Sequence, residues 1–208
     1  EIGDIIINDK GKIKAIGKGT KSSDISKSAE KIDLKGNIAI PGIVDMKAFV
    51  GEPGFEYKEN FRTLSLAALA GGVTSIVTMP NTKPIIDNVS MVDFIIRRGR
   101  DKAKVNLFPC ASITRHLQGN QMTEFGLLKA RGIIGFSDVN KTIQNTELMS
   151  RIMNYASDLD VLIMQHAEDY DLSKNSCINE GEIATRLGLQ GVSDIAEKIT
   201  IERDLSLL

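Results

Sequence analysis

Short apolar runs alternate with longer amphipathic windows from Ile38 to the end of the chain. A run such as VLIMQ is apolar at nearly every position, which is typical of a parallel strand covered on both faces. The windows carry apolar residues three and four positions apart, which is the spacing of one helix face. The pattern predicts strands at residues 38–46, 73–79, 105–111, 133–136 and 161–165, and helices at residues 58–70, 90–102, 122–130, 146–158 and 197–208.

Repeated strand–helix units predict an α/β fold, and two architectures use such units: the doubly wound sheet and the (β/α)8 barrel. No glycine-rich phosphate-binding fingerprint follows any expected strand, which disfavours the nucleotide-binding form of the doubly wound sheet. The pattern contains about five strands, whereas a complete barrel has eight. We therefore expect residues 38–208 to form the N-terminal portion of a (β/α)8 TIM-type barrel, which makes the barrel partial.

Residues 1–37 have a different pattern and are expected to form a small flanking β domain, itself partial. The β-branched runs IGDIIIN and KIKAI are joined by Asp9, Lys10 and Gly11, a composition that predicts a tight hairpin. Polar residues 17–31 follow as a surface loop, and a third short strand is expected at residues 31–34. The chain does not begin with methionine, so we expect the natural start to lie upstream.

The charge balance narrows the range of partners. The chain has 26 basic and 27 acidic residues, so no electrostatic argument favours nucleic acid or an anionic membrane. No apolar run approaches the roughly 20 residues that cross a bilayer, and the N-terminus lacks the pattern of a signal peptide. The two cysteines, Cys110 and Cys177, are widely separated and lack metal-ligand spacing, which fits a reducing compartment. These features predict a cytoplasmic protein.

Six motifs follow one another along the chain. They are PGIVDMKAFVGEPGFEYKEN (41–60), AGGVTSIVTMPNTKP (70–84), GFSDV (135–139), MQHAED (164–169), INEGE (178–182) and RLGL (186–189). In this order and spacing they resemble dihydroorotases of the cyclic amidohydrolase group. The resemblance implies a metal-dependent (β/α)8 hydrolase that interconverts carbamoyl aspartate and dihydroorotate in pyrimidine biosynthesis. Its site would lie at the carboxyl ends of the barrel strands.

The first barrel strand departs from the family pattern at three functional positions. The family pattern is Asp, apolar, His, x, His, x, Arg, in which the histidines are metal ligands and the arginine holds the substrate carboxylate. Here Asp45 is followed by Lys47, Phe49 and Gly51 at those three positions. A protonated amine has no lone pair for a cation, and a phenyl ring offers no σ-donor. Both histidine ligands and the arginine are therefore absent.

Later motifs keep part of the family site. His166 matches a family metal ligand and Asn81 matches a substrate-contacting asparagine, so both are candidates for vestigial site residues. The acidic ligand after the fourth strand aligns with Val139, although a register shift of one residue would put Asp138 there. The remaining family histidine and the catalytic aspartate fall beyond Leu208. Because a catalytic zinc site needs about three protein ligands, no cofactor is predicted, in contrast to the zinc of the family.

Several of these residues also have simpler roles. The charge of Lys47 is expected either to pair with Asp138 or Glu168, in place of the missing cation, or to extend into solvent. Phe49 is expected to fill the space of the metal site. His116 lies in a polar stretch and matches no family ligand, so an ordinary surface position is expected for it.

Three functions remain open. The first is a dihydroorotase-like protein that is non-catalytic because its metal ligands are replaced, and that acts as a structural or regulatory partner, for example of aspartate transcarbamoylase. Some members of the family are known to have that role. The second is an active dihydroorotase or related cyclic amidohydrolase whose site is completed by residues beyond 208 or by another chain. The third is an unrelated α/β binding module, which leaves the ordered motifs unexplained.

The open edges of a half barrel add an expectation about assembly. Its first and last strands would present unpaired backbone groups. We therefore expect either that the natural chain supplies further strands or that the protein is a homo- or hetero-oligomer.

Overall fold

The computed structural model describes residues 3–18 and 28–208. The chain separates into two compact units, Glu1–Pro41 and Gly42–Leu208. Among the described residues, no helix combines the length and apolar character needed to cross a membrane.

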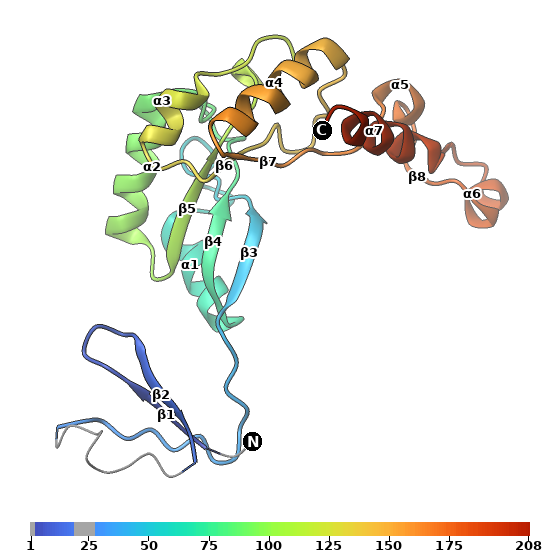
Figure 1. The fold of residues 1–208 in the computed structure, drawn as a ribbon. Helices are drawn as coiled ribbons and strands as arrows, with labels where there is room; N and C mark the ends of the chain where they lie inside the picture. The colour runs from blue at the N-terminus through green and yellow to red at the C-terminus, as the bar shows by residue number, and fades with distance from the viewer. Residues whose placement is uncertain (1–2, 19–27) are drawn as a thin grey trace. The chain divides into compact units, whose positions relative to one another are not determined.

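The N-terminal unit contains one antiparallel hairpin, formed by β1 (Asp4–Ile7) and β2 (Ile13–Gly17) (Figure 1). The Asn8 side chain accepts hydrogen bonds from the backbone N–H groups of Lys10 and Lys12, which stabilises the turn. The hairpin prediction is therefore confirmed. The third strand expected at residues 31–34 is wrong, because this segment has no regular secondary structure and its apolar side chains are exposed. Residues 19–27 of the expected surface loop lie outside the described residues.

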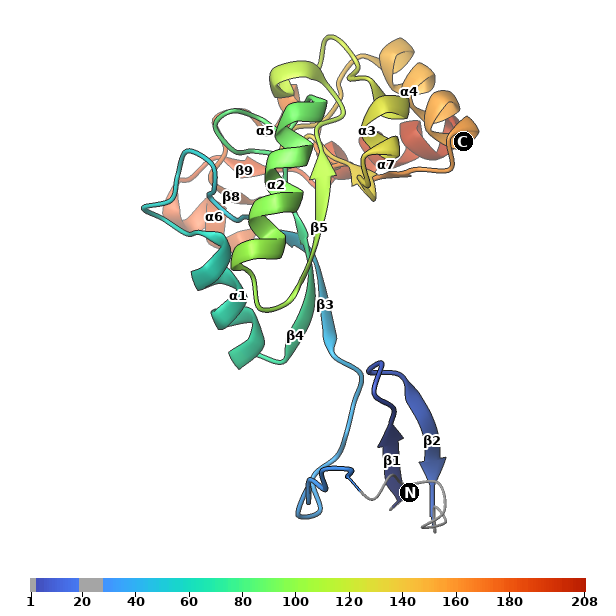
Figure 2. The same ribbon diagram turned by 90° about the vertical axis from the view of Figure 1, so that its left-hand side faces the viewer.

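The larger unit is built on a curled, five-stranded parallel sheet (Figure 1). The strands follow the chain in the order β3 (Ile43–Ala48), β4 (Val73–Thr78), β5 (Asn106–Ala111), β6 (Gly135–Phe136) and β7 (Leu162–Ile163). Four helices connect them: α1 (Phe61–Ala70), α2 (Val89–Lys102), α3 (Phe125–Ala130) and α4 (Thr146–Asp158). Figure 2 shows α1 and α2 on the same side of β4 and β5. Because every strand pairs with its successor, the carboxyl ends of all five meet at one edge.

Asparagine side chains set where three of these helices begin. Asn60 accepts hydrogen bonds from the N–H groups of the first turn of α1 and forms a capping box with Thr63. Asn88 caps α2 in the same way, and Asn145 caps α4. Each cap satisfies backbone donors that have no partner inside the helix.

The main hydrophobic core lies between the sheet and the helices. Phe136 on β6 stacks on Phe125 of α3 with ring centroids 3.9 Å apart. Other buried members of this core are Phe61, Val92, Ile95, Ala111, Leu128, Met149 and Ile152. They come from all four helices and from β5, so the helical layer is fixed to one face of the sheet.

A smaller cluster occupies the opposite face of the sheet. It contains Val77, Met79, Cys110 and Val139, with Met164 packed against them. Successive strand residues point to opposite faces, so Cys110 faces away from the core that contains Ala111. Phe108 and Leu162, each two residues before a member of this cluster, are 40% and 47% exposed. The described residues therefore cover this face only in part.

The chain continues after β7 through short elements and one longer helix (Figure 1). These are α5 (Tyr170–Ser173), β8 (Ile178–Asn179), α6 (Glu182–Leu187), β9 (Gly191–Val192) and α7 (Ile195–Ser206). Strands β8 and β9 pair in parallel with each other. The Arg203 side chain donates a hydrogen bond to the Gln144 carbonyl at 3.3 Å, which connects α7 to the segment before α4.

Element ends differ from the sequence predictions for identifiable reasons. Strand β3 begins at Ile43 because its partner β4 begins at Val73, directly after a glycine pair, so residues 38–42 have no strand beside them. Strands β6 and β7 are two residues long, shorter than their apolar runs. Helix α4 has the bounds that its apolar spacing predicts. The short elements between α5 and β9 were not predicted, because they are too short for a periodic pattern.

Candidate functional site

The candidate site lies at the carboxyl ends of the five parallel strands, here called the rim. Lys47 and Phe49 come from the end of β3, and Asn81 follows β4. Val139 follows β6 and His166 follows β7. The topology therefore brings the residues singled out from the sequence to one edge of the sheet.

Strand β3 ends irregularly where the first family ligand would stand. Asp45 pairs with Ile76 and Ala48 pairs with Thr78, so three residue steps on β3 face two on β4. Such a bulge bends the strand and changes the direction of its side chains. The Asp45 carboxylate accepts a hydrogen bond from the backbone N–H of Lys47 at 2.9 Å.

Lys47 itself is exposed, and it forms no ion pair with any residue of the described ranges 3–18 and 28–208. The two carboxylates considered as its partners are bonded elsewhere: Asp138 to Thr114 and Glu168 to His166. Of the two roles expected for this lysine, the structure has the one in which the side chain extends into solvent.

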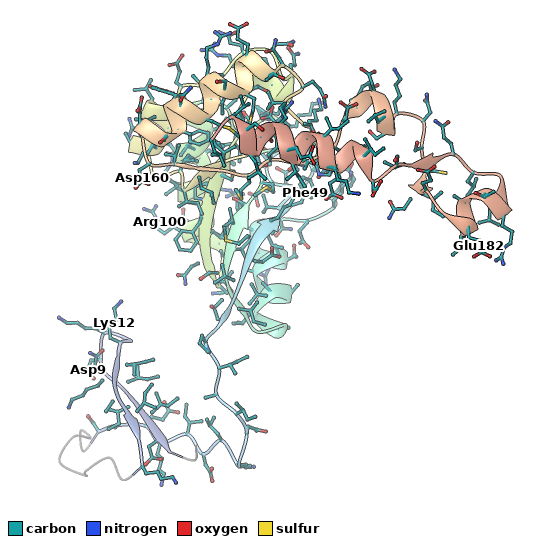
Figure 3. The ribbon with its side chains drawn as sticks, turned by 45° about the vertical axis from the view of Figure 1, so that its right-hand side comes forward. Asp9, Lys12, Phe49, Arg100, Asp160 and Glu182 are labelled. Carbon is teal, nitrogen blue, oxygen red and sulfur yellow. The ribbon has the colours of Figure 1, made fainter. Side chains whose placement is uncertain are left out.

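Phe49 lies just after β3 (Figure 3), and it packs against the loop that follows. Its ring centroid lies 6.1 Å from that of Phe55, with the planes tilted by 49°. The Lys58 ammonium lies 5.4 Å from the Phe55 centroid and 5.7 Å from the Tyr57 centroid, within the range of a cation–π contact. The Phe49 position is therefore part of an aromatic cluster, and its phenyl ring has no lone pair for a metal.

The loop closes tightly at Gly51, the position of the family arginine. Gly51 has φ +73°, and a Cβ built there would lie 2.5 Å from the Glu59 carbonyl oxygen and 2.9 Å from that of Phe55. The Phe55 N–H also donates a hydrogen bond to the Gly51 carbonyl at 2.6 Å. Any side chain at this position, arginine included, requires the loop to move.

Glu52 anchors the same loop from within. Its side chain is 5% exposed, and its Oε1 lies 2.8 Å from the guanidinium of Arg98 on α2. Its Oε2 accepts a hydrogen bond at 3.2 Å from the Phe61 N–H at the start of α1. A buried carboxylate with these partners holds the loop between two helices.

After β6, the residue that the resemblance aligns with the acidic ligand of the family lies in the core. Val139 is buried against Val77, Met79 and Cys110, and it has a left-handed backbone with φ 63°. It offers no ligand atom.

Its neighbour Asp138 is 1% exposed and turned toward the segment after β5. One carboxylate oxygen accepts from the Thr114 N–H at 3.0 Å, and the other accepts from the Thr114 hydroxyl. Burial raises the pKa of Asp138, and the hydrogen bonds from Thr114 oppose that rise. The partnership with Thr114 was missed by sequence reasoning, since the two residues are 24 positions apart with no local signal.

At the end of β7, His166 forms a pair with Glu168. The imidazole Nε2 lies 2.8 Å from the Glu168 carboxylate, and both side chains are about one-third exposed. The Thr142 hydroxyl donates to the His166 carbonyl and accepts from the Glu168 N–H. Hydrogen bonds from Ser173 and then from His166 lower the pKa of Glu168. The carboxylate therefore occupies Nε2, and a cation could reach this imidazole only through Nδ1.

Asn81, after β4, presents an unused acceptor at the rim. Its Oδ1 is buried and has no hydrogen-bond partner in the part of the chain that the structure describes. The Ser112 hydroxyl, just after the neighbouring strand β5, is buried and without a partner in the same residues. Buried polar atoms normally have a partner, so both atoms are suited to a bound water or ligand.

The zinc implied by the family resemblance does not fit this donor set. Within residues 3–18 and 28–208, no three histidine, cysteine or acidic side chains come close enough together to hold a metal ion. Catalytic zinc uses about three protein ligands of these types. At the positions that the resemblance assigns to metal ligands, the rim holds an ammonium at Lys47, a phenyl ring at Phe49 and, unless the alignment shifts by one residue to Asp138, a valine at 139.

Comparisons with known proteins agree on one family. Residues 36–208 match the family described as Dihydro-orotase-like. A dihydroorotase of Syntrophus aciditrophicus is 43% identical over 202 residues, covering 97% of this chain and 47% of the relative. A dihydroorotase of Trichlorobacter lovleyi is 39% identical over 202 residues, again covering 97% of this chain and 47% of the relative. The chain thus spans about half the length of the curated relatives that it matches.

Solved structures show the same fold. The L-hydantoinase (dihydropyrimidinase) from Arthrobacter aurescens superposes with a TM-score of 0.76 at 21% identity, covering 99% of this chain and 46% of that one. Dihydroorotase from Saccharomyces cerevisiae in complex with 5-fluoroorotic acid gives a TM-score of 0.54 at 15% identity, covering 79% of this chain and 43% of that one. These structures are amidohydrolase (β/α) barrels, so the prediction of a partial barrel of this class is confirmed.

Proposed function

The chain belongs to the dihydroorotase-like family, and from that membership we propose that it is a non-catalytic member of pyrimidine biosynthesis that acts as a structural or regulatory partner of another enzyme. A cytoplasmic location follows from the same role. Under this proposal, the chain keeps the scaffold of its relatives, but its residues do not suit their metal chemistry.

One observation carries the proposal: the end of β3 lacks both the donors and the space for the family's chemistry. Lys47 is exposed, and Phe49 packs on Phe55. The backbone at Gly51 leaves no room for a side chain. A zinc ion in such a site would lower the pKa of its bound water to about 7 and thereby supply the nucleophile. Without ligands for the ion, the rim as the described residues form it offers no group that would activate water in this way.

Aspartate transcarbamoylase is the partner that we propose. The motifs that shape the scaffold, among them EPG, AGG and MPNT, are intact while the ligand positions are not. This pattern supports the idea that the chain has kept a protein-binding surface and has not kept the catalytic activity. The partly covered face bearing Phe108 and Leu162 supports the expectation of further strands or of an oligomer.

A second candidate is an active cyclic amidohydrolase whose site is completed outside residues 1–208 or by another chain. Two residues favour it. His166 remains at the end of β7, and the unpartnered Oδ1 of Asn81 is suited to a substrate N–H group. Under this alternative, the missing ligands are supplied by residues outside the present chain.

The test uses the natural full-length protein that contains this chain. Metal content is measured by mass spectrometry of the purified protein, and hydrolysis of dihydroorotate is followed in the same sample. The Syntrophus aciditrophicus relative, purified identically, serves as the positive control. We expect neither bound zinc nor turnover, together with co-purification of aspartate transcarbamoylase from the natural host.

Each result has a definite meaning. Turnover accompanied by one or two bound metal ions per chain would establish the second candidate and exclude the first. Absence of turnover and also of any bound transcarbamoylase would remove the proposed partner. A Lys47→His/Phe49→His variant that gains zinc binding would show that these two positions alone withhold the metal.

A further inference from the structure

A cavity of about 360 Å³ opens between the start of α2, the 3-10 turn η2 (Arg115–Leu117) and α3. Figure 1 shows α2 and α3 side by side. The cavity is lined by Asp87, Asn88, Val89, Arg115, His116, Glu124, Leu127 and Leu128. None of these residues belongs to the rim set, and the volume lies within the range of small-molecule sites.

Asp87 fixes the orientation of the His116 imidazole at this cavity. The Asp87 side chain is 10% exposed, and its Oδ1 accepts a hydrogen bond from the Asn88 amide at 2.9 Å. Its Oδ2 accepts from the His116 backbone N–H at 3.1 Å and lies 3.2 Å from the ring Nδ1. A carboxylate in this position favours the tautomer with the proton on Nδ1, in which Nε2 is an acceptor.

The His116 ring lines the cavity and is accessible. The His116 side chain is 70% exposed, and within the described residues no hydrogen bond to Nε2 is formed. His116 and Leu117 both have left-handed backbones, with φ 56° and 55°. A non-glycine residue in this region is strained and persists only where its surroundings hold it. Here the two contacts from Asp87 hold it.

The remaining lining selects against an ion. Val89, Leu127 and Leu128 provide apolar walls. The Arg115 guanidinium lies 3.1 Å from the Glu124 carboxylate, so each charge neutralises the other. An apolar cavity with balanced charges and one oriented acceptor is complementary to an uncharged molecule.

We propose that this cavity is a second binding site, for a small uncharged molecule that has a ring or short aliphatic body and one hydroxyl or N–H group. The body contacts Leu127 and Leu128, and the hydroxyl or N–H group donates to Nε2 of His116. The site does not depend on the function proposed for the rim, because the two share no residue.

Phenol is the probe, since it combines an apolar ring with a single donor. The full chain is labelled at leucine methyl groups and at histidine ring nitrogens, and phenol is titrated while both sets of resonances are recorded by NMR. We expect saturable shifts at Leu127, Leu128 and His116 Nε2. Anisole, which has no donor, should bind about tenfold more weakly through loss of one hydrogen bond.

Three variants make the assignment specific. His116→Asn keeps a residue type that tolerates the left-handed backbone while removing the imidazole, and it should lose the response to phenol. Leu127→Gln changes an exposed wall residue that the fold does not need, so it should weaken binding even if the first variant is unstable. Arg115→Gln is the matched control and should bind phenol within about twofold of the parent chain.

The proposal is overturned by any of three results. Shifts that do not saturate would show that no site exists. Unchanged phenol binding by folded His116→Asn would remove the role of the imidazole. Tighter binding of benzoate than of phenol would assign the cavity to charged ligands.

Discussion

Thr114→Val is the perturbation that tests the buried Asp138 most directly. The variant keeps the volume of the side chain but removes the hydroxyl that donates to one carboxylate oxygen. It also removes the acceptor of the Gly119 N–H, which lies 2.9 Å from that hydroxyl. The backbone N–H of residue 114 still donates to the carboxylate, so the loop keeps one of its anchors.

The expected cost is the sum of the two lost hydrogen bonds. A hydrogen bond to a charged group contributes about 1.5–3 kcal/mol to stability, and a neutral one contributes about 0.5–1.5 kcal/mol. Because Asp138 is 1% exposed, water cannot replace the lost donor without entering the core. We therefore expect the free energy of unfolding at pH 7 to fall by about 2–4.5 kcal/mol.

The cost of Thr114→Val should depend on pH, because the lost hydroxyl stabilises the ionised form of Asp138. Burial raises the pKa of Asp138 above that of the unfolded chain, and the Thr114 hydroxyl lowers it, so the variant raises the pKa further. A carboxyl group with a raised pKa contributes its full stabilisation below the unfolded value of about 3.9 and loses it as the pH rises through the folded value. The cost of the variant is therefore smaller near pH 4 than at pH 7.

The assay is urea unfolding of parent and variant at both pH values, followed by circular dichroism. Thr123→Val is the matched control, because this buried hydroxyl donates at 2.7 Å to the Ser112 carbonyl and touches no carboxylate. It should cost about 1 kcal/mol at either pH. Equal costs for the two variants, or a Thr114→Val cost that does not change with pH, would refute the reasoning.

Two further predictions concern the loop after β3. Arg98→Met leaves the buried Glu52 carboxylate without its cation and should lower the free energy of unfolding by about 2 kcal/mol, less than for a fully buried pair because Arg98 is 44% exposed. Its exposed neighbour provides the control, since Arg97→Met should change unfolding in urea by less than about 0.5 kcal/mol, and comparable losses would rule out the anchoring role. Gly51→Ala combines a left-handed backbone with a close backbone contact, so thermal unfolding should occur at a clearly lower temperature than in the parent. Gly119→Ala has φ +70° and nothing near its Cβ, so it measures the backbone strain alone, and an equal shift in both variants would disprove the close contact.

The sequence by itself determined the repeating architecture and which residue types stand at the positions of the motifs. Strand and helix periods are local properties, so the parallel βα units were predicted, and α4 was placed at Thr146–Asp158. That Lys47 and Phe49 stand at two histidine positions is what the resemblance to dihydroorotases implies, and it needs only the residue types after Asp45. Residue type alone decides whether a side chain has a lone pair for a metal.

Only the tertiary structure decided how the rim residues are used. Glu52 and Arg98 are 46 positions apart, and Thr114 and Asp138 are 24 apart, so no local sequence pattern predicts either pair. The closed backbone at Gly51 and the cavity beside His116 likewise depend on loops from different βα units. These contacts follow from strand order and register, which bring together residues that are distant in the chain. The physical reason is that a buried polar group needs a hydrogen-bond partner among its spatial neighbours, whatever their distance in sequence.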